Sequence, residues 1–299
     1  MMVNAATVRL EANGPEQWSR AGALVRPLLP ASFFYAIFFA LPMLALFGLS
    51  FWRADGFVMI PDLTFANYEK IATSPLYRVL LYRTIAVGFT TALIVVPIAF
   101  TLAYIMRFVL EKRGALILQL VLLSLFSGYL VRIYAWRTIL GKQGLLNSTL
   151  QWLGLIDRPL EFLIYSNLAI VITLTGLLLP LCVLPIYSAM ANISRDYLEV
   201  ARDLGAPGHT LIRTILVPMA MPGLSTAFAF AFLLSAGDFV TPTLVGGTQS
   251  LLIGNVIADQ FRGIGSNWPL GAALAFVTIS LVLALYFLVM RLVRKVTAW

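Results

Sequence analysis

Side chains able to do chemistry are few in this chain of 299 residues, which holds 13 acidic residues, one histidine and one cysteine. A metal site or an acid–base pair needs several such groups close together. His209 has no cluster of acidic residues or histidines beside it, and Cys182 lies in the apolar stretch 181–184, where it is expected to fill packing space. We therefore expect no catalytic residue and no metal site.

One carboxylate, Asp238, stands out because it ends the uncharged run 214–237. A charge there is costly unless it faces water, a partner group or a ligand. Carboxylates and aromatic faces can replace the lost hydration of a cationic amine. The candidates for such a substrate pathway or gate are Asp238, Tyr134, Trp136 and Asp259. Two alternatives stay open: an ion pair of Asp238 with an arginine such as Arg132 that closes an external gate, and simple interface anchoring by the two aromatic residues.

A second polar feature is the segment 194–218, which is set between two long uncharged runs. Ser194 is a suitable N-cap, Gly205 can adopt the left-handed conformation that ends a helix, and Pro207 can begin the next one. The segment is expected to form two short helices joined at the glycine. Such an elbow is typical of a surface that docks on a soluble partner.

The first of these short helices is expected to be amphipathic. Its apolar stripe comprises Tyr197, Leu198, Ala201 and Leu204, and its polar face comprises Arg195, Glu199, Arg202 and Asp203. The alternative to docking is a solvated loop in which Glu199 pairs with a neighbouring arginine.

The elements that must position these residues are membrane helices. With 60% hydrophobic and 11% charged residues and a mean hydropathy of +0.90, the chain has more apolar surface than a water-soluble interior can bury. The expected fold is all-α and polytopic, with six spans in one transmembrane domain over residues 28–299. The spans are expected near 30–52, 84–106, 114–140, 166–190, 214–238 and 268–292.

Outside the spans we expect a cytoplasmic tail over residues 1–27. The first apolar run begins only near residue 28, is longer than the apolar region of a signal peptide and lacks a small-residue cleavage pattern. Short helices are expected near 145–155 and 249–261 on the external side. The net charge of +8 is carried mainly at helix ends, where it faces phospholipid headgroups, so nucleic acid is not an expected partner. Both termini are expected in the cytoplasm.

The segment 194–218 resembles the cytoplasmic signature loop of ABC-importer permeases, in which Glu-Ala-Ala is followed by Gly and later by Ile-x-Leu-Pro. The matching residues are Glu199, Ala201, Gly205, Ile215 and Pro218. Two valines, Val200 and Val217, stand where the pattern has Ala and Leu. By this resemblance the residues that couple to an ATPase are Glu199, Ala201, Arg202, Asp203, Gly205, Ala206, Pro207, Gly208, Ile215 and Pro218.

Further segments resemble the first membrane subunit of spermidine/putrescine-type importers. They are residues 127–136, 144–147, 237–247, 251–257, 260–261 and 267–271. The resemblance implies a type I ABC importer of the bacterial inner membrane, with a second homologous permease, two ATPase subunits and a periplasmic binding protein. It also implies that ATP and Mg bind the partner ATPase, in keeping with the lack of a phosphate-binding G-x-x-x-x-G-K-[ST] motif in this sequence.

Three alternative functions differ in what they require of the sequence. The same machinery could import another small nitrogenous or organic solute. A self-sufficient secondary transporter would need ion-coupling acids in mid-span, and the six runs have none in their middles. An intramembrane enzyme would need a paired constellation of catalytic groups, which one histidine in a loop does not supply. The elbow at 194–218 has no role in the last two.

Overall fold

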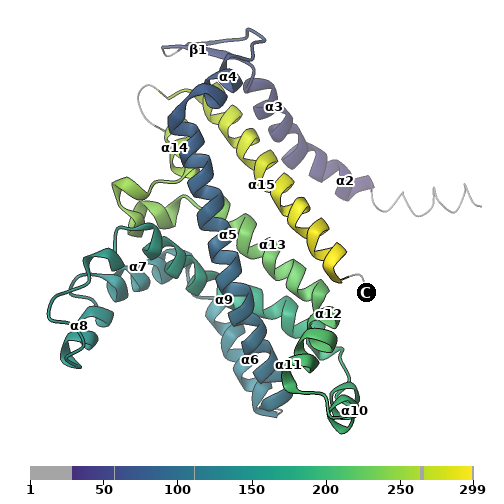
Figure 1. Ribbon diagram of the computed structural model, residues 1–299. Coiled ribbons are helices and arrows are strands. Elements are labelled where there is room, and N and C mark those ends of the chain that lie inside the picture. The colour runs from purple at the N-terminus through teal and green to yellow at the C-terminus, as the bar shows by residue number, and fades with distance from the viewer. Residues whose placement is uncertain (1–28, 57, 111, 263–265, 298–299) are drawn as a thin grey trace, which may run out of the picture.

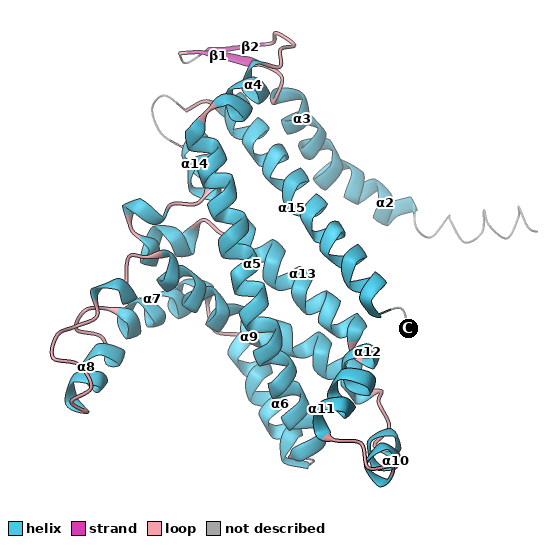
Figure 2. Cartoon of the chain, in the orientation of Figure 1, coloured by secondary structure: helices cyan, strands magenta, loops and turns pink. Residues whose placement is uncertain are grey.

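The computed structural model describes residues 29–56, 58–110, 112–262 and 266–297. The tail expected over residues 1–27 lies outside them. Figure 2 shows that these residues are almost entirely helical, with one short antiparallel hairpin. The α-helices and strands are α2 (Leu29–Tyr35), α3 (Leu41–Leu49), β1 (Arg53–Asp55), β2 (Val58–Ile60), α4 (Ala66–Thr73), α5 (Pro75–Tyr104), α6 (Lys112–Leu125), α7 (Tyr129–Leu140), α8 (Leu145–Trp152), α9 (Asn167–Ala191), α10 (Asp196–Asp203), α11 (Gly208–Thr210), α12 (Val217–Met219), α13 (Met221–Gly237), α14 (Ile253–Gln260) and α15 (Trp268–Thr297).

Within the described residues, four helical stretches are long and apolar enough to cross a membrane. They are Pro30–Leu49, Pro75–Val109, Asn167–Ala191 and Trp268–Lys295. Two bent pairs pass the same test together, so the number of spans rises to six if each pair crosses once. The all-α, polytopic expectation is confirmed, and the helix expected from residue 84 begins earlier, at Pro75, whose fixed φ suits the first helical turn.

The span expected over 114–140 is not one straight helix. The segments Arg113–Leu125 and Tyr129–Trp152 meet at 100°. The break falls at Ser127 and Gly128, and these two residue types lower helix propensity together. The span expected over 214–238 is also bent, by 75° between Gly208–Met219 and Met221–Gly237.

The core is built where α5, α9 and α13 pack against one another (Figure 1). Small residues allow the backbones to come close, as is usual between membrane helices. A Cβ on Gly223 of α13 would lie 2.8 Å from Ala189 Cβ of α9 and nearer still to the Pro185 carbonyl oxygen. Only glycine therefore fits at this crossing.

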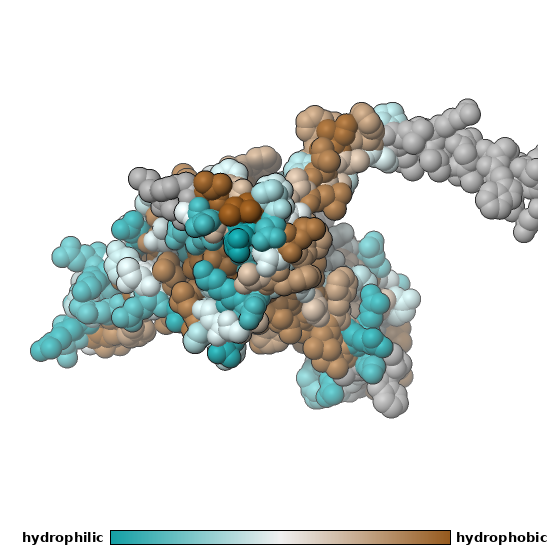
Figure 3. All heavy atoms as spheres, turned by 90° about the horizontal axis from the view of Figure 1, so that it is seen from above, coloured by the Kyte–Doolittle hydropathy of each residue, from teal (hydrophilic) through white to brown (hydrophobic). Residues whose placement is uncertain are grey.

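Helices α2 and α3 lie at the margin of the molecule. No residue of the Pro30–Leu49 stretch is buried. Seen from above in Figure 3, this helix stands apart from the rest and presents brown apolar residues. A five-residue π-helical turn, Ala36–Ala40, precedes Pro42, whose ring prevents a regular α-helical bond at that point.

The short helices outside the spans agree with the sequence. The helix expected near 145–155 is α8, and the one expected near 249–261 is α14, preceded by a 3₁₀ turn at Thr248–Ser250. The hairpin β1–β2 was not expected. It pairs Arg53 with Ile60 and lies at the end of the molecule opposite α10 (Figure 1).

Candidate functional site

A cavity of about 420 Å³ lies between the break of α6 and α7, the middle of α9 and the end of α13. Most of its wall is leucine. The leucines are Leu125, Leu174, Leu177, Leu178, Leu181, Leu233 and Leu234. The polar side chains that line it are Tyr129, Arg132 and Asp238.

Asp238 directly follows α13, where it starts the next helical segment. Its Oδ1 accepts hydrogen bonds from the backbone amides of Val240 at 2.8 Å and Thr241 at 3.3 Å. The residue is only 9% exposed, its second oxygen, Oδ2, is buried, and its carboxylate interacts with the Tyr129 side chain. One carboxylate oxygen therefore caps the chain segment that follows α13, at the edge of a cavity that Asp238 lines.

The other two polar side chains come from the first turn of α7. Arg132 Nη1 donates to the Leu177 carbonyl of α9 at 3.1 Å, whereas its Nε is buried without a partner. The Tyr129 hydroxyl lies 3.3 Å from Thr241 Oγ1. None of the described residues forms an ion pair with Asp238, so the gate-closing Asp238–Arg pair is not present in this structure.

The structure does not bring the four residues expected in the pathway together. Tyr134 is half exposed on the outer side of α7, and Asp259 is exposed on α14. Trp136 packs against Gly176 of α9, one turn beyond the cavity. Only Asp238 lines the cavity.

Sequence reasoning missed Tyr129 and gave Arg132 only a closing role. Both lie on one face of α7 with Ile133 and Trp136, at the helical spacing i, i+3, i+4 and i+7. This spacing is the signal that would have found them. The exposed residues between them, such as Tyr134, lie on the opposite face.

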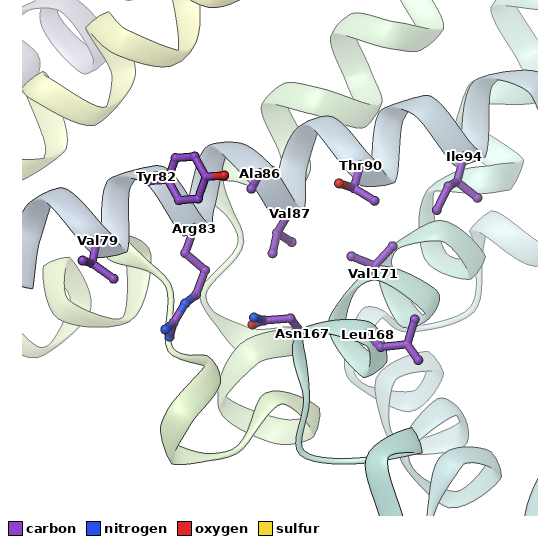
Figure 4. Close-up of a pocket in the computed structure, with 10 residues that line it drawn as sticks. All are labelled: Val79, Tyr82, Arg83, Ala86, Val87, Thr90, Ile94, Asn167, Leu168 and Val171. Atoms are coloured by element: carbon purple, nitrogen blue, oxygen red, sulfur yellow. The ribbon is translucent and has the colours of Figure 1, made fainter. Parts of the chain in front are cut away.

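A larger groove of about 570 Å³ lies between α5 and α9 (Figure 4). Its lining is mainly apolar, and Arg83 is the charged residue among those shown in the figure. The Arg83 guanidinium donates to the carbonyls of Gln249 and Leu251. Since this cation already has partners, the smaller cavity, whose lining includes the Asp238 carboxylate, is the better candidate for binding a solute.

The second candidate region is the elbow, defined here as residues 194–218. Its base is fixed to the core by Leu198, Leu211 and Leu216, which are buried. Arg107, in the π-helical turn after α5, donates to the carbonyl of Ile193 at 3.4 Å. The elbow is therefore seated on the ends of α5 and α9 rather than hanging from them.

The first helix of the elbow, α10, ends at Gly205 as expected. Gly205 has a φ of +78°, and its amide donates to the Arg202 carbonyl at 2.8 Å. The Ala206 amide donates to the Ala201 carbonyl at 3.0 Å, which completes a Schellman motif. The N-terminal end differs by one residue from the expectation: Arg195 is the N-cap, and Ser194 Oγ accepts from the Asp196 amide at 3.3 Å.

The expected apolar stripe of α10 divides into two faces. Leu198 and Ala201 face the core, whereas Tyr197 and Leu204 are exposed together with Val200, at 56%, 82% and 57%. The spacing 197, 200 and 204 places these three on one outward stripe. We call these three residues the outward apolar face.

The remaining elbow residues expected to couple to an ATPase differ in exposure. Exposed residues among them are Glu199, Arg202, Asp203, Gly205, Pro207, Gly208 and Pro218. Ala206 and Ile215 are half buried against the core. On α10 the exposed polar side chains of Glu199, Arg202 and Asp203 thus accompany the outward apolar face.

Comparisons with known proteins agree with this architecture. Residues 25–298 match the model of the family described as "Binding-protein-dependent transport system inner membrane component". The spermidine/putrescine transport system permease protein PotB of Haemophilus influenzae is 33% identical over 269 residues, covering 88% of this chain and 93% of that protein. The inner membrane ABC transporter permease protein YdcU of Escherichia coli is 31% identical over 278 residues, covering 89% of this chain and 87% of that protein.

Solved structures share the fold. A chain of a bacterial ABC transporter that imports the acidic polysaccharide alginate aligns with a TM-score of 0.75 at 18% identity, covering 94% of this chain and 98% of the other. A chain of the MetNI methionine ABC transporter aligns with a TM-score of 0.51 at 20% identity, covering 75% of this chain and 99% of the other. The chain therefore belongs to the binding-protein-dependent transport system inner membrane components, the permease subunits of ABC importers.

Proposed function

We propose that this chain forms half of the translocation pathway of an ATP-driven importer for a small amine-bearing solute, with polyamines such as spermidine and putrescine as the first candidates. A second homologous permease supplies the other half. Two ATPase subunits bind ATP and Mg on the cytoplasmic side, where both termini of this chain lie. A periplasmic protein delivers the solute to the opposite side of the bacterial inner membrane.

The observation that carries this proposal is the outward apolar face of the elbow. Three large apolar side chains, Tyr197, Val200 and Leu204, are exposed on a helix whose other face is anchored in the core through Leu198. A polar loop gains nothing from exposing them to water, whereas a groove on an ATPase subunit would bury them. The anchoring transmits movement of such a partner to α5 and α9.

The substrate class rests on the polyamine permeases at 33% identity and on the cavity beside α7. The Asp238 carboxylate in its lining has the charge that attracts an ammonium group, and the leucine wall suits a methylene chain. Arg132 in the same cavity is consistent with the second candidate, the same machinery importing another small nitrogenous or organic solute.

Uptake into liposomes tests the proposal. The liposomes contain this chain with its co-purified permease and ATPase subunits, with loaded binding protein outside and ATP inside. We expect uptake of labelled spermidine or putrescine that needs every component and is competed by unlabelled polyamine. ATP hydrolysis without uptake of either amine would contradict the polyamine assignment, and uptake without the ATPase would contradict the importer mechanism.

A further inference from the structure

Two hollows of about 410 and 210 Å³ lie end to end between α13 and α15 (Figure 1). They form one continuous groove, because both are lined by Ala236, Gly237, Thr278 and Ile279. Ile279 is 46% exposed and Leu283, farther along α15, is 38% exposed, so the groove opens to the outside of the molecule. We call it the α13–α15 groove.

Arg262 is the charged residue in the lining of this groove, and it lies at one end. Its side chain is exposed, and its guanidinium carbon lies 5.1 Å from the centre of the Phe239 ring. Neither of the two ion pairs among the described residues includes it. A guanidinium that rests on an aromatic face keeps donors open to an anion, and its planar fork suits phosphate. The end of the groove at Arg262 is therefore suited to a phosphate group.

The groove runs along α15 for about the depth of one leaflet of a bilayer. The rings of Phe261 and Trp268 lie 6.0 Å apart, and tryptophan at the end of a membrane helix marks the headgroup level. The lining residues of α15 then extend from Ala275 to Leu283, which is about 12 Å of helix. The hydrocarbon of one leaflet is about 15 Å deep. The groove therefore begins with Arg262 near the headgroups and ends near the middle of the membrane.

We propose that the α13–α15 groove holds an anionic phospholipid, with its phosphate on Arg262 and one acyl chain along Leu233 and Leu283. The wall facing the chain is apolar, and the one hydroxyl in it, that of Thr278, already donates to the Leu274 carbonyl at 2.7 Å. A helix of another subunit is a poorer occupant, since a helix is about 10 Å wide and needs a groove through both leaflets. The inference goes beyond the proposed function and does not depend on the solute that is carried.

A phosphatidylglycerol with a photoactivatable diazirine in one acyl chain is the probe. It is added to the delipidated complex of this chain with its permease and ATPase partners in detergent micelles, and the adducts are mapped by mass spectrometry of peptides. The competitors are unlabelled phosphatidylglycerol, phosphatidylcholine and glycerol 3-phosphate. Glycerol 3-phosphate has the phosphate without the chains, so it distinguishes a lipid site from a site for a soluble phosphate.

We expect adducts on peptides of α13 and α15. Phosphatidylglycerol should compete about fivefold better than phosphatidylcholine, as expected for one arginine near an anionic headgroup. Arg262→Gln should remove this preference while the adducts stay on the same peptides. Gly237→Leu should weaken the binding of both lipids about tenfold, because a Cβ at residue 237 meets nothing within 4 Å and the longer side chain displaces methylene groups from the groove.

Arg78→Gln is the matched control, because Arg78 is an exposed arginine in the first turn of α5 and does not line the groove. It should leave the preference for phosphatidylglycerol unchanged. Three results overturn the assignment. Adducts spread evenly over α13, α15 and the unburied helix Pro30–Leu49 mean annular lipid only. Competition by glycerol 3-phosphate as strong as that of the lipid means a phosphate site without a chain, and no adducts on α13 and α15 mean that another subunit fills the groove.

Discussion

Gly176 of α9 lies directly against the indole ring of Trp136 of α7. A Cβ on Gly176 would lie 2.6 Å from Trp136 Nε1 and closer still to its ring carbons. The ring is held among buried apolar residues of α9 and α7, including Ile133 and Leu140. This contact fixes the direction in which α7 leaves the break after α6, and so the position of Arg132 in the cavity.

Gly176→Ala should therefore destabilise the chain. An indole is too rigid to give way, and overpacking of this kind costs about 1–3 kcal/mol. Thermal unfolding of the purified complex measures the change. Trp136→Ala in the same chain should restore part of the loss, because the two substitutions share one contact.

The control is Gly48→Ala, since a Cβ on Gly48 of α3 meets nothing within 4 Å. Its melting temperature should stay at or above that of the wild type. An unchanged melting temperature for Gly176→Ala would show that α7 shifts freely on α9, contrary to the contact described.

Lys142 and Glu161 tie the end of α7 to the 3₁₀ turn before α9. Lys142 Nζ lies 2.8 Å from Glu161 Oε1, and this hydrogen bond, together with the lysine's charge, lowers the pKa of Glu161 below its ordinary value of 4.5. A carboxylate with a lowered pKa stabilises the fold above its ordinary pKa, and the contribution is lost as pH falls through the folded value. The pair is exposed, so the effect is small and screened by salt.

Glu161→Gln should melt slightly below the wild type at neutral pH and low salt. The difference should shrink as the pH falls below 4.5 and as salt is added, and Lys142→Gln should reproduce both trends. If the difference in melting temperature does not change with pH, it arises from packing of residue 161 and not from the ion pair with Lys142.

The sequence predicts most helices because their signals are local. The apolar runs define the spans, and Ser166 begins α9 by accepting a hydrogen bond from the Ala169 amide at 3.1 Å. Gly205 ends α10 because a left-handed residue is required there. The runs are contiguous in the sequence, and each of the two helix ends depends on residues close together in the chain.

The features that sequence reasoning did not predict depend on contacts between distant segments. The 100° break after Leu125 turns α7 across α9, and this turn decides that Arg132 rather than Tyr134 lines the cavity. In the elbow, packing of Leu198 on the core leaves Val200 outside, although both side chains are apolar. Apolar periodicity identifies two faces of such a helix but does not tell which one is covered.

Substitutions of Leu204 and Leu198 test docking and folding separately, because Leu204 is 82% exposed whereas Leu198 is 4% exposed. Leu204→Asp should leave thermal unfolding of the permease unchanged but should release the ATPase subunit, as measured by co-elution. Leu198→Ala should lower stability by about 2–5 kcal/mol, as is typical when a buried leucine is truncated.

The matched control for Leu204→Asp is Leu155→Asp, since Leu155 is also largely exposed but lies beyond α8, far from the elbow along the chain. Co-elution of the ATPase should be unaffected. If both aspartate variants release the ATPase equally, the outward apolar face is not the docking surface.

Gly205 sets the angle at which the elbow is held, and its φ of +78° is open to glycine and, at some cost, to asparagine. Gly205→Pro fixes φ near −65° and removes the amide that donates to the Arg202 carbonyl, so the Schellman motif is lost. Gly205→Asn retains both the amide and access to the left-handed region.

We expect both variants to insert into the membrane and to assemble with the second permease. Uptake coupled to ATP hydrolysis should fall at least about tenfold in the proline variant, a loss of at least about 1.4 kcal/mol of coupling. The asparagine variant should stay close to the wild type, and Glu199→Lys should reproduce the proline phenotype by reversing a charge beside the outward apolar face. Normal uptake by the proline variant would remove the mechanical role from the elbow, whereas equal loss in the asparagine variant would assign the effect to residue size rather than to the turn.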